Sequence, residues 1–447
     1  MTARLVTGFR KSWWPKLHRR GLFLLGGLAT GAAAVAMAIL ADKAQAIFFS
    51  ASRHWAAFPF VATPAGFALA VWLTRRFAPG AQGSGIPQVI AAHHVRDPQS
   101  RAPLVSIRMG LAKIGLLTLG LLSGASAGRE GPTVQVGAAI MAALGRLEPH
   151  RQPGLLIAGS AAGVAAAFNA PLAGIVFGIE EMSRSFEVRT SGLVVGTVIA
   201  AGLTSLAILG DYTYFGTTAV TLPFGRLWLM IPVAAVICGL LGGLFSRILI
   251  AFAQGLRGGP GFWIRRWPVG FAALCGLLVA FCGVASDGTI FGTGYEQSKE
   301  ILSGADLPWL FGPVKLIATA LSSISGIPGG IFSPSLAVGA GLGYDLHALV
   351  PGFPVEVLAI LCMAAYLAGV VQAPMTSFVI VGEMTANHAL VFPIMLSAVI
   401  GFAASRLVCP EGVYHVLSRQ FLPRDPVSAD TAMQEAHDER VDVEAEG

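Results

Sequence analysis

Two acidic residues follow long apolar stretches of this chain, and acids at such positions are the side chains best placed to carry chemistry. Glu130 lies in the sequence SAGREGP at Ser126–Pro132, and Glu181 lies in Glu180-Glu181-Met182. A charged side chain at membrane depth costs about 2.5–3.5 kcal/mol on insertion scales and commonly marks an ion or proton pathway. Both carboxyl groups are therefore candidates for proton transfer.

Three glycine-rich segments each end in a proline and are expected to open a helix. They are GSGIP at Gly83–Pro87, GREGP at Gly128–Pro132 and GIFSP at Gly330–Pro334. Proline suits the first helical turn, and glycine permits the tight turn before it. The first amides of a helix lack partners within the helix and carry partial positive charge. Several such ends directed at one point would make an anion site without a fixed cation.

The composition indicates a helical protein that crosses a membrane many times. Hydrophobic residues make up 54% of the chain and charged residues 12%, with a mean hydropathy of +0.69. A soluble domain has about 25% charged residues. The length leaves room for many helices of the roughly 20 residues that a bilayer requires. The net charge of +6 comes from residues at span ends, so we expect no nucleic-acid partner.

The two ends of the chain differ in charge. Basic residues precede the first apolar run, Gly21–Leu40, and no acid occurs before Asp42, which predicts a cytoplasmic N-terminus. The run is long for a signal peptide, so we expect a retained first span. Eight of the 24 acidic residues lie in 424–447, which predicts a disordered tail. We expect no metal site, because the five cysteines show no ligand spacing and His93-His94 fits a cytoplasmic loop.

The chain also repeats itself at an offset of 202 or 203 residues. The matched pairs are Lys113 with Lys315, Glu130 with Phe332, Pro132 with Pro334, Ala170-Pro171 with Ala373-Pro374, and Glu181-Met182 with Glu383-Met384. Weak repeats with interrupted spans are typical of transporters built from two related halves, in which ligands bind where the half-helices meet.

Together, the three glycine-rich motifs resemble the signature motifs of the CLC chloride channels and chloride/proton antiporters, in order and in spacing. The resemblance covers Gly21–Leu422 and implies an all-α membrane protein with about 18 helices. It implies two inverted-topology repeats, whose broken helices meet at mid-membrane, and a homodimer without cofactors. The expected segments are a basic cytoplasmic segment at 1–20, a first repeat at 21–210, a linker at 211–226, a second repeat at 227–409, a last helix with the ion-site tyrosine at 410–423 and the acidic tail at 424–447.

The resemblance also implies a role for each matching residue. Ser84, Tyr414 and the backbone amides of Ile331 and Phe332 would bind the central chloride. Glu130 would be the gating glutamate, sharing an external anion site with the amides from Arg129 to Gly131. Glu181 would accept protons from the cytoplasm.

These roles predict coupled exchange of chloride for protons across the bilayer of the cell (inner or plasma) membrane, with both termini cytoplasmic. A passive voltage- or pH-gated chloride channel is the main alternative. Exchange is favoured over it, because channels of the family usually lack an acid at the position of Glu181. A fluoride exporter fits the motifs less well. An intramembrane enzyme is disfavoured, because no Ser/His dyad or HExxH pattern is found.

Some positions depart from the family or allow simpler interpretations. Gln88 and Ile90 stand where close bacterial relatives carry acids, so Lys113 could pair with Glu181 or be neutral. The structural alternatives are a helix cap or an interfacial carboxylate for Glu130, a pair with Arg184 for Glu181, an N-cap for Ser84 and an interfacial aromatic for Tyr414. Glu383 is interpreted as a structural residue at a helix end.

Overall fold

The computed structural model describes residues 2–95, 97–147, 152–183, 188–210, 213–256, 258–350 and 352–422, and within them the fold is all-helical. The prediction of about 18 helices is confirmed by 19 α-helices in these ranges. The side chains of residues 2–19, 147, 152, 183, 188–191 and 260 are not described. The acidic tail expected at 424–447 lies outside the described residues.

The first half of the chain contains nine α-helices and a π-helical turn. They are α1 (Thr2–His54), α2 (Phe58–Phe77), α3 (Ile86–His94), α4 (Pro98–Arg101), α5 (Ile107–Leu122), α6 (Glu130–Leu144), α7 (Gln152–Phe168), α8 (Pro171–Phe177), the π-helix η4 (Gly178–Ser183) and α9 (Val188–Leu209).

The second half contains ten α-helices. They are α10 (Met230–Gln254), α11 (Gly259–Arg266), α12 (Pro268–Ala285), α13 (Tyr295–Leu302), α14 (Phe311–Ile324), α15 (Phe332–His347), α16 (Val355–Val371), α17 (Pro374–Thr385), α18 (Val391–Arg406) and α19 (Val413–Ser418), which is followed by the short turn η7 (Arg419–Phe421).

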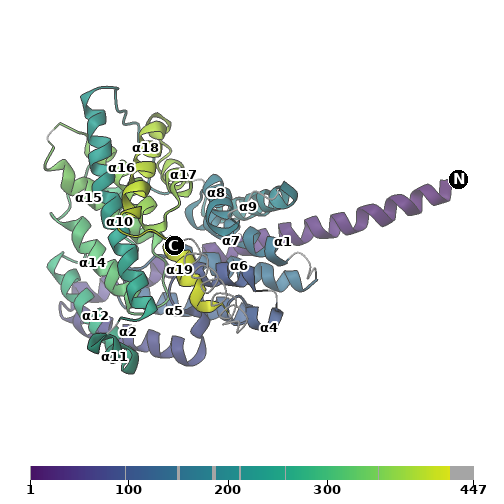
Figure 1. Cartoon of the computed structure of the whole chain (residues 1–447), viewed down its shortest axis with the longest axis horizontal. Coiled ribbons are helices and arrows are strands. Elements are labelled where there is room, and N and C mark those ends of the chain that lie inside the picture. The colour runs from purple at the N-terminus through teal and green to yellow at the C-terminus, as the bar shows by residue number, and fades with distance from the viewer. Residues whose placement is uncertain are drawn as a thin grey trace, which may run out of the picture.

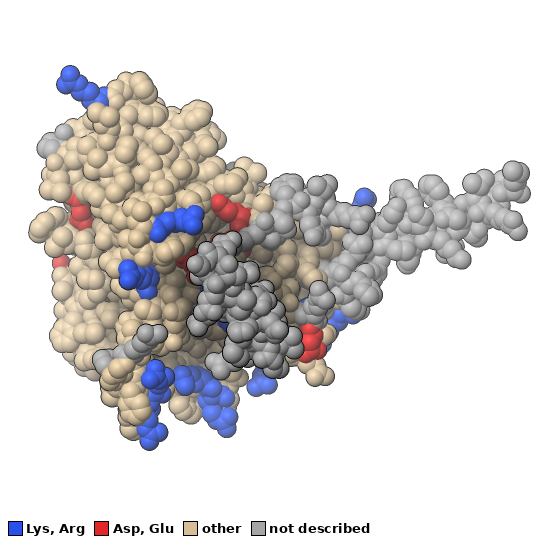
Figure 2. Space-filling view, in the orientation of Figure 1, with Lys and Arg blue, Asp and Glu red and all other residues tan. Residues whose placement is uncertain are grey.

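Five described helices are long and apolar enough to cross a membrane. They cover Arg20–His54, Gly192–Leu209, Arg226–Gln254, Pro268–Ala285 and His388–Arg406. Further apolar helices are only 10–17 residues long, which is shorter than the roughly 20 residues of a full span. Figure 2 shows that most of one face carries no charged side chain, with Lys and Arg gathered mainly along its lower edge.

Figure 1 shows α6 to α9 of the first half on one side of the molecule and α14 to α18 of the second half on the other, whereas α2 of the first half packs against α12 of the second. Equivalent helices pack in the same way, with α6 against α7 in the first half and α15 against α16 in the second. Every residue of α16 from Val357 to Val371 is buried, so this helix forms the centre of its half. Small residues permit the close packing: a side chain on Gly239 of α10 would overlap the backbone of Gly401 of α18.

Equivalent breaks interrupt the helices of both halves. Asn169 and Gln372 have φ values of 51° and 58°, in the left-handed region, and each precedes an Ala-Pro pair. Proline disfavours the helical conformation in the residue before it, so the helix must end there and restart at Pro171 or Pro374. The repeat expected from the sequence is therefore present in the backbone.

The two halves meet at an isolated antiparallel bridge between Gly128 and Gly330, which are themselves equivalent by sequence offset. Each amide donates to the other residue's carbonyl at 2.7 Å. Reciprocal bonds between equivalent residues are what a local twofold axis between two repeats produces. The bridge lies immediately before α6 and α15, so it brings the beginnings of these two helices together.

Candidate functional site

The three glycine-rich segments converge at one place inside the protein. The Gly329 amide donates to the Gly83 carbonyl at 3.0 Å, which links the third segment to the first. The bridge between Gly128 and Gly330 links the third segment to the second. A side chain on Gly131 would overlap the Ser84 hydroxyl, so these two residues are in close contact. The beginnings of α3, α6 and α15 therefore surround a common point.

The first turns of α6 and α15 have the same hydrogen-bonding pattern. The first closed helical bond of α6 runs from the Thr133 amide to the Arg129 carbonyl at 2.9 Å, and that of α15 from the Ser335 amide to the Ile331 carbonyl at 3.0 Å. A proline, Pro132 or Pro334, lies just before each donor and has no N–H to satisfy. Each helix thus presents the amides of its first two residues to the site.

Glu130 is fully buried, and its carboxylate binds the first turn of α15. The Ser333 amide donates to Oε2 at 3.4 Å, and the Ser333 hydroxyl donates to Oε1. Sequence reasoning expected this carboxylate near the amides of its own helix, from Arg129 to Gly131. The structure places it on the equivalent helix of the other repeat, because Gly128 has no side chain and leaves room for the carboxylate to cross.

Two further residues at this position were missed from the sequence. Ser333 binds the carboxylate directly, and its place beside the amide of Phe332 in the third motif was a usable signal. Tyr214 places its hydroxyl 3.4 Å from the Ser333 hydroxyl, and its ring contacts Phe168 at a centroid distance of 5.7 Å. Tyr214 lies in the connection between the repeats, where no motif marked it.

Ser84 and Tyr414 supply hydroxyl groups to the same region. The two hydroxyls lie near each other, yet neither forms a hydrogen bond of good geometry with the described residues. Ser84 does not act as a helix cap, since Gly85 is the N-cap of α3 and no side chain caps it. Both residues line a cavity of about 360 Å³ together with Ile331. The Phe332 ring packs 6.0 Å from that of Tyr414 and walls the site.

The side chain of Arg129 is directed away from the site. Its Nη1 donates to the Ala38 carbonyl of α1 at 3.2 Å and forms an ion pair with Asp42 at 3.0 Å. Only the backbone of Arg129 and Gly131 can therefore face an anion near Glu130. The guanidinium instead fixes the beginning of α6 to α1.

Glu180 and Glu383 cap each other's repeats. The Glu180 carboxylate accepts from the amides of Met375 and Thr376 at 3.0 and 2.6 Å, at the beginning of α17. The Glu383 carboxylate accepts from the amides of Leu172 and Ala173 at 3.1 and 2.7 Å, at the beginning of α8. The structural role expected for Glu383 is observed.

The sequence pairing of Glu181 with Glu383 is therefore corrected, since Glu180 is the equivalent of Glu383. The first repeat has one more residue after its Ala-Pro break, and η4 accommodates it as a π-helical turn. Single π-turns inside helices occur frequently at functional sites. The extra residue is Glu181, which is thereby released from the capping position.

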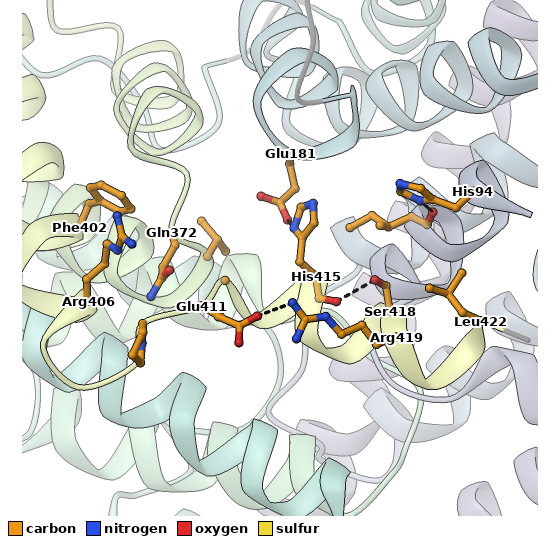
Figure 3. A pocket seen from close by; sticks show the side chains of 14 residues that line it. His94, Glu181, Gln372, Phe402, Arg406, Glu411, His415, Ser418, Arg419 and Leu422 are labelled. Carbon is orange, nitrogen blue, oxygen red and sulfur yellow. Dashed lines mark hydrogen bonds and ion pairs between the residues drawn. The ribbon is translucent and has the colours of Figure 1, made fainter. Parts of the chain in front are cut away.

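Glu181 lies at the wall of a second cavity of about 490 Å³. Figure 3 shows its carboxylate facing the imidazole of His415, whose Nδ1 lies 3.3 Å from Oε1. Ile90, one of the two positions that depart from the family, lines the same cavity and adds no charge. Arg184, the alternative partner of Glu181, lies outside the described residues.

The buried lysines hold backbone carbonyls in both repeats. Lys113 Nζ donates to the carbonyls of Ala81 and Gly83, each at 2.6 Å. Lys315 Nζ donates to those of Ile290 and Gly292 at 2.7 and 2.8 Å. Pairing with Glu181 was one of two alternatives for Lys113. The observed contacts of Lys113 are instead with the chain just before Ser84, which it orients. Gln88 also binds this segment, donating to the Gln82 carbonyl at 2.6 Å.

The last helix, α19, separates the two cavities. Tyr414 and Leu417 line the cavity at Ser84, whereas His415 and Ser418 line the cavity at Glu181. His93 and His94, expected in a loop, form the end of α3, and no group of three or more potential metal ligands occurs among the described residues.

The fold and the site together define a membrane transport protein with two related halves rather than an enzyme. A model of the voltage-gated chloride channel family matches residues 66–406, and the chain belongs to this family, the CLC proteins.

Solved structures of CLC proteins are similar over most of the chain. A slow cyanobacterial Cl⁻/H⁺ antiporter is 25% identical, with a TM-score of 0.77 over 90% of this chain and 97% of that one. A CLC-type fluoride/proton antiporter is 23% identical, with a TM-score of 0.76 over 90% and 98%. A eukaryotic CLC transporter is 20% identical, with a TM-score of 0.72 over 90% and 74%.

Proposed function

We propose that this protein exchanges chloride for protons across the membrane. The observation that carries the proposal is the position of the Glu130 carboxylate, which rests on the first turn of α15 beside the unpaired hydroxyls of Ser84 and Tyr414. A carboxylate and a halide are both anions that hydrogen-bond donors and a helix N-terminus attract. The two anions would therefore compete for the same donors.

Competition of this kind links proton binding to anion binding. Protonation of Glu130 removes its charge and weakens its bonds to Ser333, since hydrogen bonds to charged groups are worth about 1.5–3 kcal/mol and neutral ones about 1 kcal/mol. The side chain can then leave, and chloride can occupy its place. Two ligands whose binding affects each other are thermodynamically coupled.

The central anion would bind the hydroxyls of Ser84 and Tyr414 and the amides of Ile331 and Phe332. Buried donors nearly always have a partner, and these two hydroxyls have none of good geometry among the described residues. These four donors carry no net charge, so they would bind an anion loosely enough to release it. The basic residues among those that line the cavity are Arg75 and Arg265.

Protons would reach Glu130 from the cytoplasm through Glu181. Glu181 is buried at the edge of a cavity that α19 separates from the anion cavity. Separate entrances allow protons and chloride to approach the common site independently, which exchange in opposite directions requires. A passive chloride channel would have no need for this second acid.

The experiment uses purified protein in liposomes, with chloride and pH electrodes recording together. An exchanger uses an outward chloride gradient to drive protons inward against their own gradient, and addition of a proton ionophore collapses that movement. A passive channel dissipates chloride without uphill proton movement, which would contradict the proposal. Replacing chloride with fluoride distinguishes the fluoride exporter, which would move protons faster with fluoride.

We also propose a location in the cell membrane with cytoplasmic termini, and assembly as a homodimer with one pathway in each subunit. The basic residues before the first span support the orientation. Cysteine accessibility at positions 5 and 445, measured from each side of sealed vesicles, tests the orientation. The mass of the protein in detergent, corrected for bound detergent, tests the dimer.

A further inference from the structure

We propose that His415 is the residue that passes protons between the internal cavity and Glu181. The inference rests on the proposed exchange and adds a titratable group to its internal proton route. In the proposed step, Nδ1–H of the His415 imidazolium transfers its proton directly to Glu181 Oε1, which leaves a neutral imidazole with its hydrogen on Nε2. Rotation of the ring returns Nδ1 to cavity water, from which it takes up the next proton.

The distance and the exposure of the two side chains fit this order. His415 Nδ1 lies 3.3 Å from Glu181 Oε1, and this contact does not meet hydrogen-bond geometry in the present conformation, so the imidazole must turn to align Nδ1–H with the carboxylate before transfer. The side chains are 19% and 6% exposed, respectively. The histidine is therefore the more accessible member of the pair, and the carboxylate is the deeper one. Imidazole is also the side chain that ordinarily changes charge between about pH 5 and 8.

Other charged or titratable groups around His415 have contacts of their own. His94 of α3 has its Nδ1 2.8 Å from the Ile90 carbonyl. Glu411 forms an ion pair with Arg419 of η7 at 2.5 Å, and both side chains are more than half exposed (Figure 3). Further such groups on the neighbouring elements include Glu180 of η4, His93 of α3, Arg406 at the end of α18, Tyr414 on α19, and Arg247 on α10 near Cys409.

The position of His415 on α19 separates the pair of His415 and Glu181 from the cavity proposed for the anion. The neighbouring residue, Tyr414, faces the chloride cavity, so consecutive residues of one helix serve the two cavities. A proton taken up at His415 therefore enters on the side of α19 that the anion does not use.

The test is His415→Gln in the liposome assay. We expect chloride flux to persist and proton flux to fall by roughly 10-fold or more, since positioned acid–base groups typically contribute about 10²–10⁴-fold to proton transfer. The dependence of proton flux on internal pH between 5 and 8 should also flatten. His94→Gln changes an imidazole in the same cavity and should leave proton flux and its pH profile unaltered.

His415→Lys separates a relay from a structural ion pair. A lysine can still pair with Glu181 but does not ordinarily release its proton near neutral pH. The relay predicts that this variant folds, moves chloride and remains slow for protons. Full proton flux in His415→Lys, or an unchanged rate and pH profile in His415→Gln, would overturn the inference and leave the exchange intact. A wild-type protein that moves no protons would overturn both.

Discussion

In the first repeat the helix at the bridge begins with an acid, Glu130, whereas in the second repeat the equivalent helix begins with Phe332. The surrounding frames are alike: each has a buried lysine on backbone carbonyls, a proline in the first turn and a glutamate that caps the opposite half. The structural residues are thus equivalent in the two repeats, whereas the acid at the start of the helix is present only in the first. The second repeat supplies donors at Ser333, and the first supplies the carboxylate that occupies them.

A second asymmetry lies after the Ala-Pro breaks. The first repeat inserts one residue in a π-helical turn, and the second repeat has no insertion. Glu180 and Glu383 keep the cap, while Glu181 faces a cavity. One inserted residue on a symmetric frame is therefore enough to add an acid without losing a structural bond.

The largest expected effect comes from removing the acid that distinguishes α6 from α15. Glu130→Gln keeps the shape of the side chain but cannot ionise, so proton flux should fall by at least about 100-fold while chloride still moves. Simultaneous chloride and pH recording in liposomes measures both. Proton coupling retained in this variant would show that the asymmetry between Glu130 and Phe332 has no role in coupling.

Glu181→Gln should reduce proton flux by about 10²-fold and leave chloride flux present, because it removes the inserted acid without touching the anion site. Glu180→Gln is the matched control one residue away, and it should retain proton flux. If Glu181→Gln retains as much proton flux as Glu180→Gln, then Glu181 has a structural role and does not transfer protons.

Removal of two donors should weaken the central anion site. Tyr414→Phe together with Ser84→Ala keeps the ring against Phe332 but deletes both hydroxyls. At about 1.5–3 kcal/mol for each of the two bonds to an anion, affinity should fall by roughly 100-fold or more. Isothermal calorimetry with chloride measures it, and an undiminished affinity would remove these residues from the site.

Ser333→Ala tests the bond between the repeats. Loss of the hydroxyl that donates to Glu130 should destabilise the conformation in which the carboxylate rests on α15 by about 1.5–3 kcal/mol. The population of molecules in which the carboxylate has left this position should therefore rise by roughly tenfold or more. Chloride flux should rise and the number of protons moved per chloride should fall. Phe215→Leu, at a buried aromatic beside Tyr214, is a control for packing. Slower chloride flux in Ser333→Ala would contradict the proposal that the Ser333 hydroxyl holds Glu130 in the anion's place.

The smallest effect is expected for the symmetric caps. Glu383→Gln and Glu180→Gln each weaken two bonds to helix amides, so the free energy of unfolding should fall by about 1–2 kcal/mol. Thermal unfolding in detergent should give similar decreases for the two, since their contacts match. A large decrease in the thermal stability of one variant alone would show that the two caps do not contribute equally to stability.

Sequence reasoning reached the fold and much of the site because both depend on glycine and proline at fixed positions. The motifs predicted which helix ends converge, and the offset between Lys113 and Lys315 predicted the repeat. The sequence comparison paired Glu181 with Glu383 because a single inserted residue shifts the offset between the repeats by one. Offsets of 202 and 203 were both compatible with the amino-acid sequence. The contacts of Glu130 with Ser333, and of Glu181 with His415, join residues far apart in the chain. The third motif marked Ser333 as a candidate, but no local pattern could show its contact with Glu130 or that of Glu181 with His415.

The central claim is that a halide can take the place of the Glu130 carboxylate at the Ser333 amide, at the beginning of α15. The direct measurement is anomalous diffraction from crystals soaked in bromide, comparing the wild-type protein with Glu130→Ala. We predict a bromide peak within hydrogen-bonding distance of the Ser333 amide in the variant, and none there in the wild type with its carboxylate in place. No bromide at this position in the variant, or bromide beside the seated carboxylate in the wild type, would contradict the account.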